Sequence, residues 1–438
     1  MSAASCIASP PMAAVAPSAS TTMPTYAGQS TLISRAELLV KVLSVPAQPA
    51  AAVSAELVVH VTGGSFADAQ DVLTYLQSVG RATHTGDGSY RIRRVQRPGS
   101  TDDLRTPLLR HADWFLRRAL AADLTIRPHD RRSAPPPTST VHTFPGTEDA
   151  VRWYTDNARH LQALLPVLLD LGRFDLTWRS AENLWALSRW TGDHHSACEA
   201  QMIGLTVAQR SPGLSRRARL LARADHLTRA GTSLVDSGRH AAALPLCEEA
   251  VAIAAAEDSP TVLSAALAAR AHAQHTAGHT GRAAVDLFRA LERAQDDHSR
   301  ALRHHHLAVV LTDLDRHDEA MINLAYAARL MRVLGDDLGR ARVTTSHADT
   351  LTRTGHPNQA FALLADSLPI VTRSGCALDV AEAQAALGRC ARATGDLEGA
   401  LAWFTAARTN YLAAGHDHRA QAMQPAILHC AADSGGGG

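Results

Sequence analysis

A spaced pattern of small residues recurs five times between residues 216 and 411 and constrains the fold more than any other feature. In each unit a turn residue is followed five positions later by alanine: Gly238 and Ala243, Gly278 and Ala283, Asp315 and Ala320, Gly355 and Ala360, Gly395 and Ala400. Further small residues lie seven positions before each turn and seven positions after each alanine: Gly231, Ala271, Ala308, Ala348, Gly388; Ala250, Ala290, Ala327, Ser367, Ala407. The turn residues are spaced by 40, 37, 40 and 40 positions.

This register predicts five pairs of antiparallel helices, each pair joined by a tight turn. Small residues at a helix crossing let two backbones approach closely, whereas Leu287, Leu324, Leu364 and Phe404 fill the space between units. One pair is too short to bury a core alone, so neighbouring pairs must stack into a solenoid. A generic alanine-rich helical bundle is the alternative, but it would not require a constant register.

The spacing of these small residues resembles that of tetratricopeptide repeats, although the unit is longer than the usual length of about 34 residues. The resemblance implies an all-α, TPR-like α-solenoid whose inner face binds protein or peptide. We also predict a small winged-helix-like domain at the N-terminal end, from signals described below. The full predicted division is 1–31 disordered, 32–98 winged-helix-like, 99–146 helix and Pro-rich linker, 147–212 Trp-rich capping module, 213–430 repeats, and 431–438 disordered tail.

Composition excludes several classes of function for this chain of 438 residues. The net charge of +1 gives no global attraction to nucleic acid or membrane. No stretch approaches 18 consecutive apolar residues, and the first cationic side chain is Arg35, so we expect neither a membrane span nor a secretory signal. The six cysteines are scattered, which favours reduced thiols and a cytoplasmic location.

The winged-helix-like unit is predicted from a helix over Phe66–Val79 followed by two short strands around the turn at residues 86–88. The helix that would enter the major groove carries Asp68 and Asp71 but no cation, which argues against DNA binding. Positive charge lies further on, with twelve arginines and six aspartates from residue 81 to 133. The alternative function is therefore DNA binding, with candidate phosphate contacts at Arg91, Arg93, Arg94 and Arg97.

Aromatic residues gather between residues 147 and 210, a region that fits the repeat poorly. They are Trp153, Tyr154, Trp178, Trp185 and Trp190. Their bulk indicates a heavily packed cap on the solenoid. A pocket for an aromatic ligand, in a small-molecule sensor or an enzyme, is the second alternative.

The order of these parts is similar to one group of regulators, the NTPase-containing STAND regulators of actinobacteria, including the antibiotic-regulatory type. The likeness rests on the winged-helix-like unit, the apolar patterns at residues 108–116 and 126–129, the Trp-rich region and the long repeats. The chain departs from that group because it has no G-x-x-x-x-G-K-[ST] loop, and Lys41 follows no glycine loop. The resemblance therefore implies the sensing and interaction part of a regulator, without nucleotide switching.

Catalytic and metal sites find no support in the sequence. Histidines 304–306 are adjacent, and neighbours on a helix point about 100° apart, so the three cannot converge on one ion. No nucleophile elbow, H-E-x-x-H helix or dinucleotide loop occurs. We expect a non-enzymatic protein with no cofactor and no bound metal.

The predicted binding site is the inner face of the solenoid, formed by polar residues of the first helices. Transferring the repeat register gives the following groove residues: Asp225, Thr228, Thr232, His272, His275, His305, Thr312, Asp313, Arg342, Asp349, Arg353, Arg389 and Arg392. This set is cationic toward the C-terminal end and would suit an acidic or extended peptide. An ordinary solvated surface is the alternative. Its three histidines could also make binding depend on pH near 6–7.

The sequence therefore predicts a non-enzymatic protein-binding or peptide-binding adaptor or sensor. The regulatory setting, in transcription or secondary metabolism, is implied by resemblance alone. The partner's identity and the oligomeric state are not defined by any sequence feature.

Overall fold

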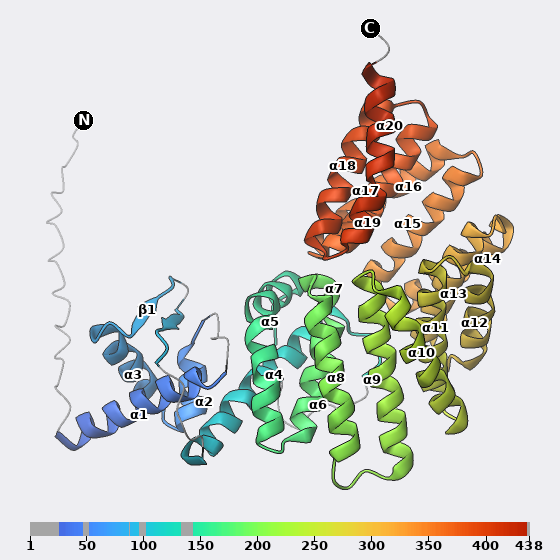
Figure 1. Cartoon of the computed structure of the whole chain (residues 1–438). Helices are drawn as coiled ribbons and strands as arrows, with labels where there is room; N and C mark the ends of the chain where they lie inside the picture. The colour runs from blue at the N-terminus through green and yellow to red at the C-terminus, as the bar shows by residue number, and fades with distance from the viewer. Residues whose placement is uncertain (1–25, 47–51, 87, 96–101, 133–142, 436–438) are drawn as a thin grey trace, which may run out of the picture.

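The computed structural model describes residues 26–46, 52–86, 88–95, 102–132 and 143–435. Within these residues the chain is almost entirely helical (Figure 1), which confirms the all-α solenoid class. No helix in these ranges combines the length and apolarity that a membrane crossing requires.

The N-terminal elements are three helices followed by a hairpin: α1 (Tyr26–Ser44), α2 (Ala55–Thr62), α3 (Phe66–Ser78), β1 (Ala82–His84) and β2 (Tyr90–Ile92). Serine caps start α2 and α3, and Ser65 forms a capping box with Asp68. The strands pair antiparallel, with Ala82 opposite Ile92. This is the predicted order of elements, while the winged-helix assignment itself stays a prediction.

A long helix joins these elements to the Trp-rich module. After a short 3₁₀ turn (Asp102–Leu104), α4 (Arg105–Ile126) packs against α2, α5 and α6. The helices of the module are α5 (Thr147–Asp170), α6 (Phe174–Ala186), α7 (Ser188–Thr191) and α8 (His194–Arg210). Glycines 172 and 192 end α5 and α7 with positive φ, at the turns that the sequence indicated.

Five helix pairs follow the module, as the register predicted, and two further helices cover the last pair. They are α9 (Arg216–Asp236) with α10 (His240–Ala256), α11 (Pro260–Thr276) with α12 (Thr280–Arg293), α13 (Asp297–Asp313) with α14 (His317–Leu334), α15 (Asp337–Arg353) with α16 (Pro357–Arg373), α17 (Ala377–Ala393) with α18 (Leu397–Ala413), then α19 (Asp417–Ala422) and α20 (Gln424–Gly435).

Backbone angles and burial confirm the register of the repeats. All five turn residues have positive φ, including Asp315 at 57°, where the other four units have glycine. The five alanines that follow these turns are completely buried. At the crossing of α17 and α18, a Cβ on Gly388 would lie 2.7 Å from the Phe404 ring, so only glycine fits there. The small residues therefore lie where helices touch.

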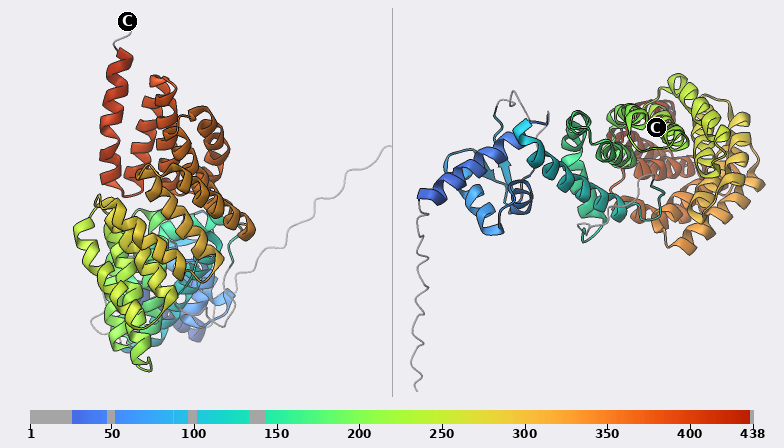
Figure 2. Two further views of the ribbon diagram at one scale, coloured as in Figure 1. Left: turned by 90° about the vertical axis from the view of Figure 1, so that its right-hand side faces the viewer. Right: turned by 90° about the horizontal axis from the view of Figure 1, so that it is seen from below.

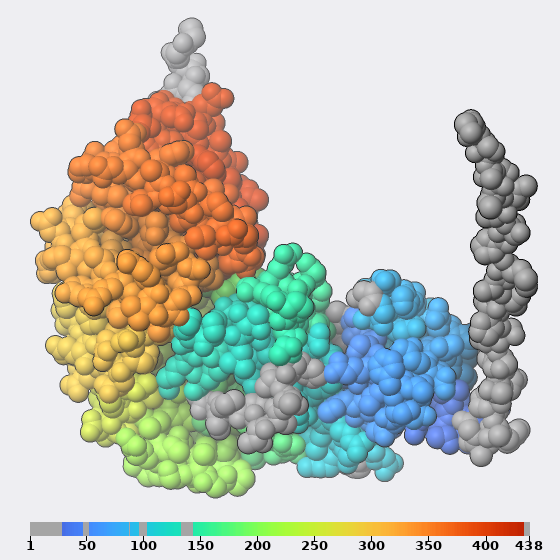
Figure 3. Space-filling model, turned by 180° about the vertical axis from the view of Figure 1, so that it is seen from behind, coloured from blue at the N-terminus to red at the C-terminus, as the bar shows by residue number. Residues whose placement is uncertain are grey.

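The solenoid curves back so that its last repeats meet the Trp-rich module (Figure 1). Helix α17 contacts α7, and one apolar core runs from α1 through the module to Leu378 and Tyr411. Figure 2 shows the same curvature from two further sides, and in Figure 3 the C-terminal repeats lie directly beside the module. The inner face is therefore partly closed, an arrangement that the sequence did not predict.

Two predicted boundaries are wrong in detail. Helix α1 begins at Tyr26, inside the segment 1–31 predicted to be disordered. Helix α20 continues to Gly435, past the predicted start of the tail at residue 431. Residues 1–25 and 436–438 lie outside the described residues.

Candidate functional site

Five predicted groove residues form a chain of ion pairs across the first helices of the repeats. His275 lies 2.8 Å from Asp313, whose other oxygen accepts from Arg353 at 2.7 Å. Arg353 also lies 3.4 Å from Asp349, which pairs with Arg389 at 2.5 Å. These charges largely neutralise one another. The inner face is therefore less cationic than the residue types indicated, because each repeat supplies the counter-ions of its neighbour.

Other predicted groove residues are distributed between buried and accessible places. Thr228 and Thr312 are buried, and their hydroxyls donate to carbonyls of their own helices, so they cannot contact a partner. Asp225 is also buried and accepts a hydrogen bond from Arg131 at 2.8 Å. Arg392 is exposed, with its guanidinium 5.9 Å from the centre of the Phe404 ring.

A buried carboxylate joins the module to the C-terminal repeats. Asp379 on α17 has no exposed side-chain surface and pairs with Arg189 at 2.5 Å and with Arg342 at 2.7 Å. Burial alone would raise the pKa of Asp379, but the two guanidinium charges and their hydrogen bonds outweigh burial and lower it. Nearby, Glu382 pairs with Arg419 at 2.7 Å. We call Arg189, Arg342 and Asp379 the seam triad.

Backbone contacts close the same seam. The indole N–H of Trp190 donates to the Ser374 carbonyl at 3.1 Å. His194 Nε2 lies 3.1 Å from the Ala414 carbonyl. A Cβ on Gly415 would clash with the carbonyl oxygen of Gly192, and both glycines have positive φ. The two backbones can therefore approach only because neither residue has a side chain.

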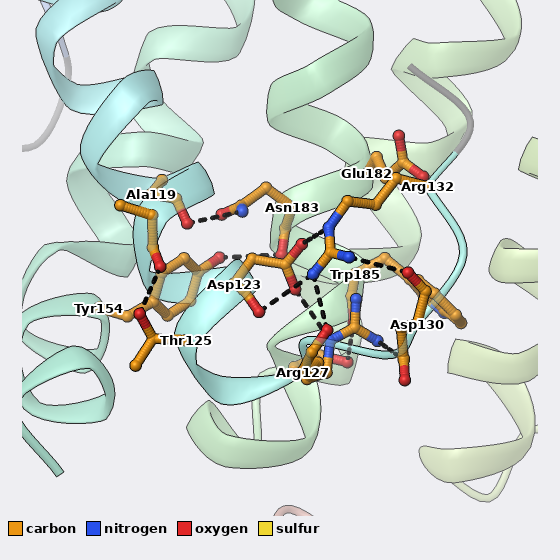
Figure 4. A network of polar contacts seen from close by, with 12 residues as sticks. Ala119, Asp123, Thr125, Arg127, Asp130, Arg132, Tyr154, Glu182, Asn183 and Trp185 are labelled. Carbon is orange, nitrogen blue, oxygen red and sulfur yellow. Dashed lines mark hydrogen bonds and ion pairs between the residues drawn. The ribbon is translucent and has the colours of Figure 1, made fainter. Parts of the chain in front are cut away.

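The end of α4 and the segment after it lie against the inner face of the solenoid. Figure 4 shows Asp123 accepting from Arg127 and Arg132, while Arg127 also pairs with Asp130 at 2.6 Å. His298 of α13 reaches Asp130 at 3.5 Å. This network holds the segment in place and connects α4 to the solenoid.

These elements enclose a cavity of about 220 Å³ between the module and the inner face. Its walls combine apolar, aromatic and charged side chains from segments far apart in the sequence. Its lining includes Ile126, Arg127, Asp130, Trp185, Arg189, Trp190, His194, Thr232, Asp236, His298, Leu302, His305, Met331, Asp336, Arg342 and Leu378. Three predicted groove residues are among them, Thr232, His305 and Arg342. We call this space the seam cavity.

The histidines of the inner face do not support binding that changes near pH 6–7. Burial lowers the pKa of His272 and of His305 to about 4. These rings are therefore neutral at pH 6–7, and the expectation from histidine composition is wrong for His272 and His305. Desolvation by the surrounding solenoid is the reason.

The arginines proposed to contact DNA differ in the contacts that they make. Arg94 donates to the Ser44 and Pro46 carbonyls at 3.0 and 2.7 Å, so it ties the hairpin to α1. Arg91 and Arg93 are exposed, and Arg97 lies outside the described residues. No group of three or more His, Cys, Asp or Glu side chains in the described ranges is arranged to hold a metal.

Sequence reasoning missed Arg189, His194, Asp236 and Asp379, which form much of the seam. None belongs to a motif, and Arg189 and Asp379 are 190 positions apart. The only available signal was Trp190, whose position beside Arg189 was attributed to packing in the cap. Polar residues flanking a tryptophan are too common to predict such a contact.

No family model and no curated protein matches the chain. Among solved structures, it is similar to BtubC (BKLC) from P. vanneervenii, at 18% identity and a TM-score of 0.39, over 54% of this chain and 92% of that one. It is also similar to a Rap protein complexed with Competence and Sporulation Factor, at 11% identity and a TM-score of 0.43, over 73% and 96%.

A third similar structure is a STAND protein with a tetratricopeptide repeat sensor from Pyrococcus horikoshii. The identity is 11% and the TM-score 0.41, over 94% of this chain and 66% of that one. The likeness to these three proteins concerns the fold alone.

Proposed function

We propose that this chain is a non-enzymatic regulatory sensor or adaptor that binds a peptide or protein segment on the inner face of its solenoid. The observation that carries the proposal is the seam cavity, which opens where the Trp-rich module meets the first helices of the repeats. A concave site between two units, lined by charged, aromatic and apolar side chains, can hold and orient a side chain of a peptide.

The size and lining of the inner face favour a peptide over a small metabolite alone. A volume of about 220 Å³ holds roughly seven waters at about 30 Å³ each, which is enough for one large side chain. Beyond the cavity, the charges from His275 to Arg389 continue along the first helices. An extended segment would place one end in the cavity and its backbone along these charges.

The regulatory setting, in transcription or secondary metabolism, extends the resemblance to STAND regulators and belongs to the proposal. So does the cytoplasmic location. DNA binding through Arg91 and Arg93 remains an alternative that no contact in the structure favours.

The test is a selection of random short displayed peptides on the full chain, with nuclease present in one arm. Thr232 lines the cavity and is partly exposed, so Thr232→Phe should fill the cavity without entering a helix crossing. Thr405 is exposed on α18 and provides the matched control, Thr405→Phe. Peptides should be retained by the wild type and by Thr405→Phe and lost by Thr232→Phe.

Two results would contradict the proposal. Peptides that bind Thr232→Phe as well as the wild type would remove the cavity from the site. Recovery of nucleic acid alone, lost on nuclease treatment and weakened steeply by salt, would favour the DNA alternative.

A further inference from the structure

One wall of the seam cavity holds two hydrogen-bond acceptors that face each other. His194 Nε2 lies 3.1 Å from the Ala414 carbonyl, and a carbonyl oxygen only accepts, so Nε2 carries the proton. In the neutral form of the ring, Nδ1 is then an acceptor. Nδ1 is buried, makes no hydrogen bond, and lies 3.9 Å from a carboxylate oxygen of Asp236.

This arrangement lacks a donor within the described part of the chain. A separation of 3.9 Å is too long for a direct hydrogen bond, whichever protonation state the ring adopts. It is short enough for a single ammonium group, placed to one side of the line that joins the two atoms, to donate to both of them. The side chain of His194 is only 3% exposed, so bulk water does not compensate for the missing donor.

Among the described residues Asp236 has no arginine or lysine as a counter-ion, and it occupies an unfavourable place in its helix. It is the last residue of α9, where the helix dipole disfavours a carboxylate. Arg419 is the arginine whose charge acts on it, and Arg419 is paired with Glu382 at 2.7 Å. No arginine or lysine of the described residues lies within ion-pair distance of Asp236. The carboxylate is therefore available to a cation that enters the cavity.

The lining of the cavity also includes apolar side chains. Trp190, Met331 and Leu378 line the same cavity as His194 and Asp236. A buried ammonium group requires a counter-ion and acceptors for its N–H bonds. The apolar part of the same ligand requires apolar side chains to pack against. The lining of the cavity contains both kinds of group.

We infer that the seam cavity binds a protonated amine carried on an apolar or aromatic body, with the ammonium between His194 Nδ1 and Asp236. The inference rests on the proposed function and specifies its ligand. Two sources share this chemistry, the free amino terminus of a peptide and a small arylalkylamine. For a peptide, the amino terminus would enter the cavity and the chain would leave along the first helices.

The test is isothermal titration calorimetry on the full chain with four probes. Phenethylamine represents a small amine and 2-phenylethanol its neutral counterpart; phenylalanyl-alanine amide represents a free amino terminus and its N-acetylated form the neutral counterpart. The wild type should bind one or both amines more than about tenfold more tightly than the neutral counterparts, as charged hydrogen bonds require. Which amine binds identifies the source.

Asp236→Asn is the decisive variant, and Asp366→Asn, at an exposed position on α16, is its control. Asp236→Asn should abolish the preference for amines, and its melting temperature should be unchanged or higher because the carboxylate opposes the helix dipole. Asp366→Asn should leave binding intact. Equal binding of amine and neutral probes, or amine binding unaffected by Asp236→Asn, overturns the inference.

The peptide selection separates this result from a failure of the proposed function. Selected peptides that depend on Thr232 but bind equally with acetylated amino termini would leave the peptide site standing and remove the amine assignment alone.

Discussion

Single small residues decide how closely the helices of this chain approach one another. Ala320 is completely buried where α13 and α14 cross, and the equivalent alanines of the other four repeats are equally buried. A larger side chain at such a crossing must move one helix or adopt a strained rotamer. The five alanines therefore define the geometry of the solenoid although they carry no chemistry.

We expect Ala320→Leu to lower the free energy of unfolding by about 1–3 kcal/mol, because the added methyl groups overpack the crossing. Ala325 lies on the same helix but is exposed, so Ala325→Leu should change stability by less than about 0.5 kcal/mol. Denaturant unfolding of both variants measures the difference. Equal stabilities would mean that α13 and α14 do not cross at Ala320.

At the scale of elements, the seam triad attaches α7 of the module to α15 and α17 of the repeats. Asp379 is fully buried and holds two arginines that come from opposite sides of the seam. A buried charge that loses its partner is costly, because its desolvation is no longer compensated. The triad therefore makes the closure of the inner face specific.

We expect Asp379→Asn to destabilise the fold by about 3 kcal/mol, because two partly buried arginines lose their counter-ion. It should also release Trp190 from Ser374, which a change in tryptophan fluorescence would report. Asp337→Asn is the matched control, since its pair with Arg340 is exposed and contributes little. A triad variant as stable as this control would show that the seam is held by other contacts.

At the scale of the whole molecule, the curved solenoid buries several histidines fully or in part. Burial lowers the pKa of His226 to about 3, and those of His272 and His305 to about 4, from an ordinary value of 6.5. The folded chain therefore keeps these rings neutral where the unfolded chain would protonate them. The cost of this difference depends on pH.

Stability should fall as the pH is lowered from 6.5 to about 4. In that window the unfolded chain binds more protons than the folded chain, so acid favours unfolding. Below the ordinary aspartate pKa of 3.8, the stabilisation that comes from Asp379 is also lost progressively. In that range the unfolded chain protonates this carboxylate before the folded chain does, because the pKa of Asp379 is lowered in the folded chain. Denaturant midpoints across this range measure the slope. Stability that is flat or increases on acidification would contradict buried neutral histidines.

The repeat unit, its register and its turns could be predicted from the sequence because they are local and recur five times. A turn residue and an alanine five positions later act within one helix pair, so Gly278 and Ala283 are informative without knowledge of distant residues. Three predicted inner-face residues, Thr232, His305 and Arg342, line a cavity, and their role in binding stays a prediction. The sequence did not predict that Asp349 and Arg389 pair with each other, because ion pairing between repeats depends on how far each side chain reaches.

Closure of the solenoid onto the Trp-rich module was decided by tertiary structure alone. Small differences in angle accumulate over five helix pairs, and only their sum brings Ala414 to His194. The seam cavity exists because of this accumulated curvature. Asp236 and His194 come from helices whose sequences contain no binding motif. Sequence determined the repeating part, which local packing specifies, whereas the long-range curvature of the chain determined where the acceptors, charges and apolar wall meet.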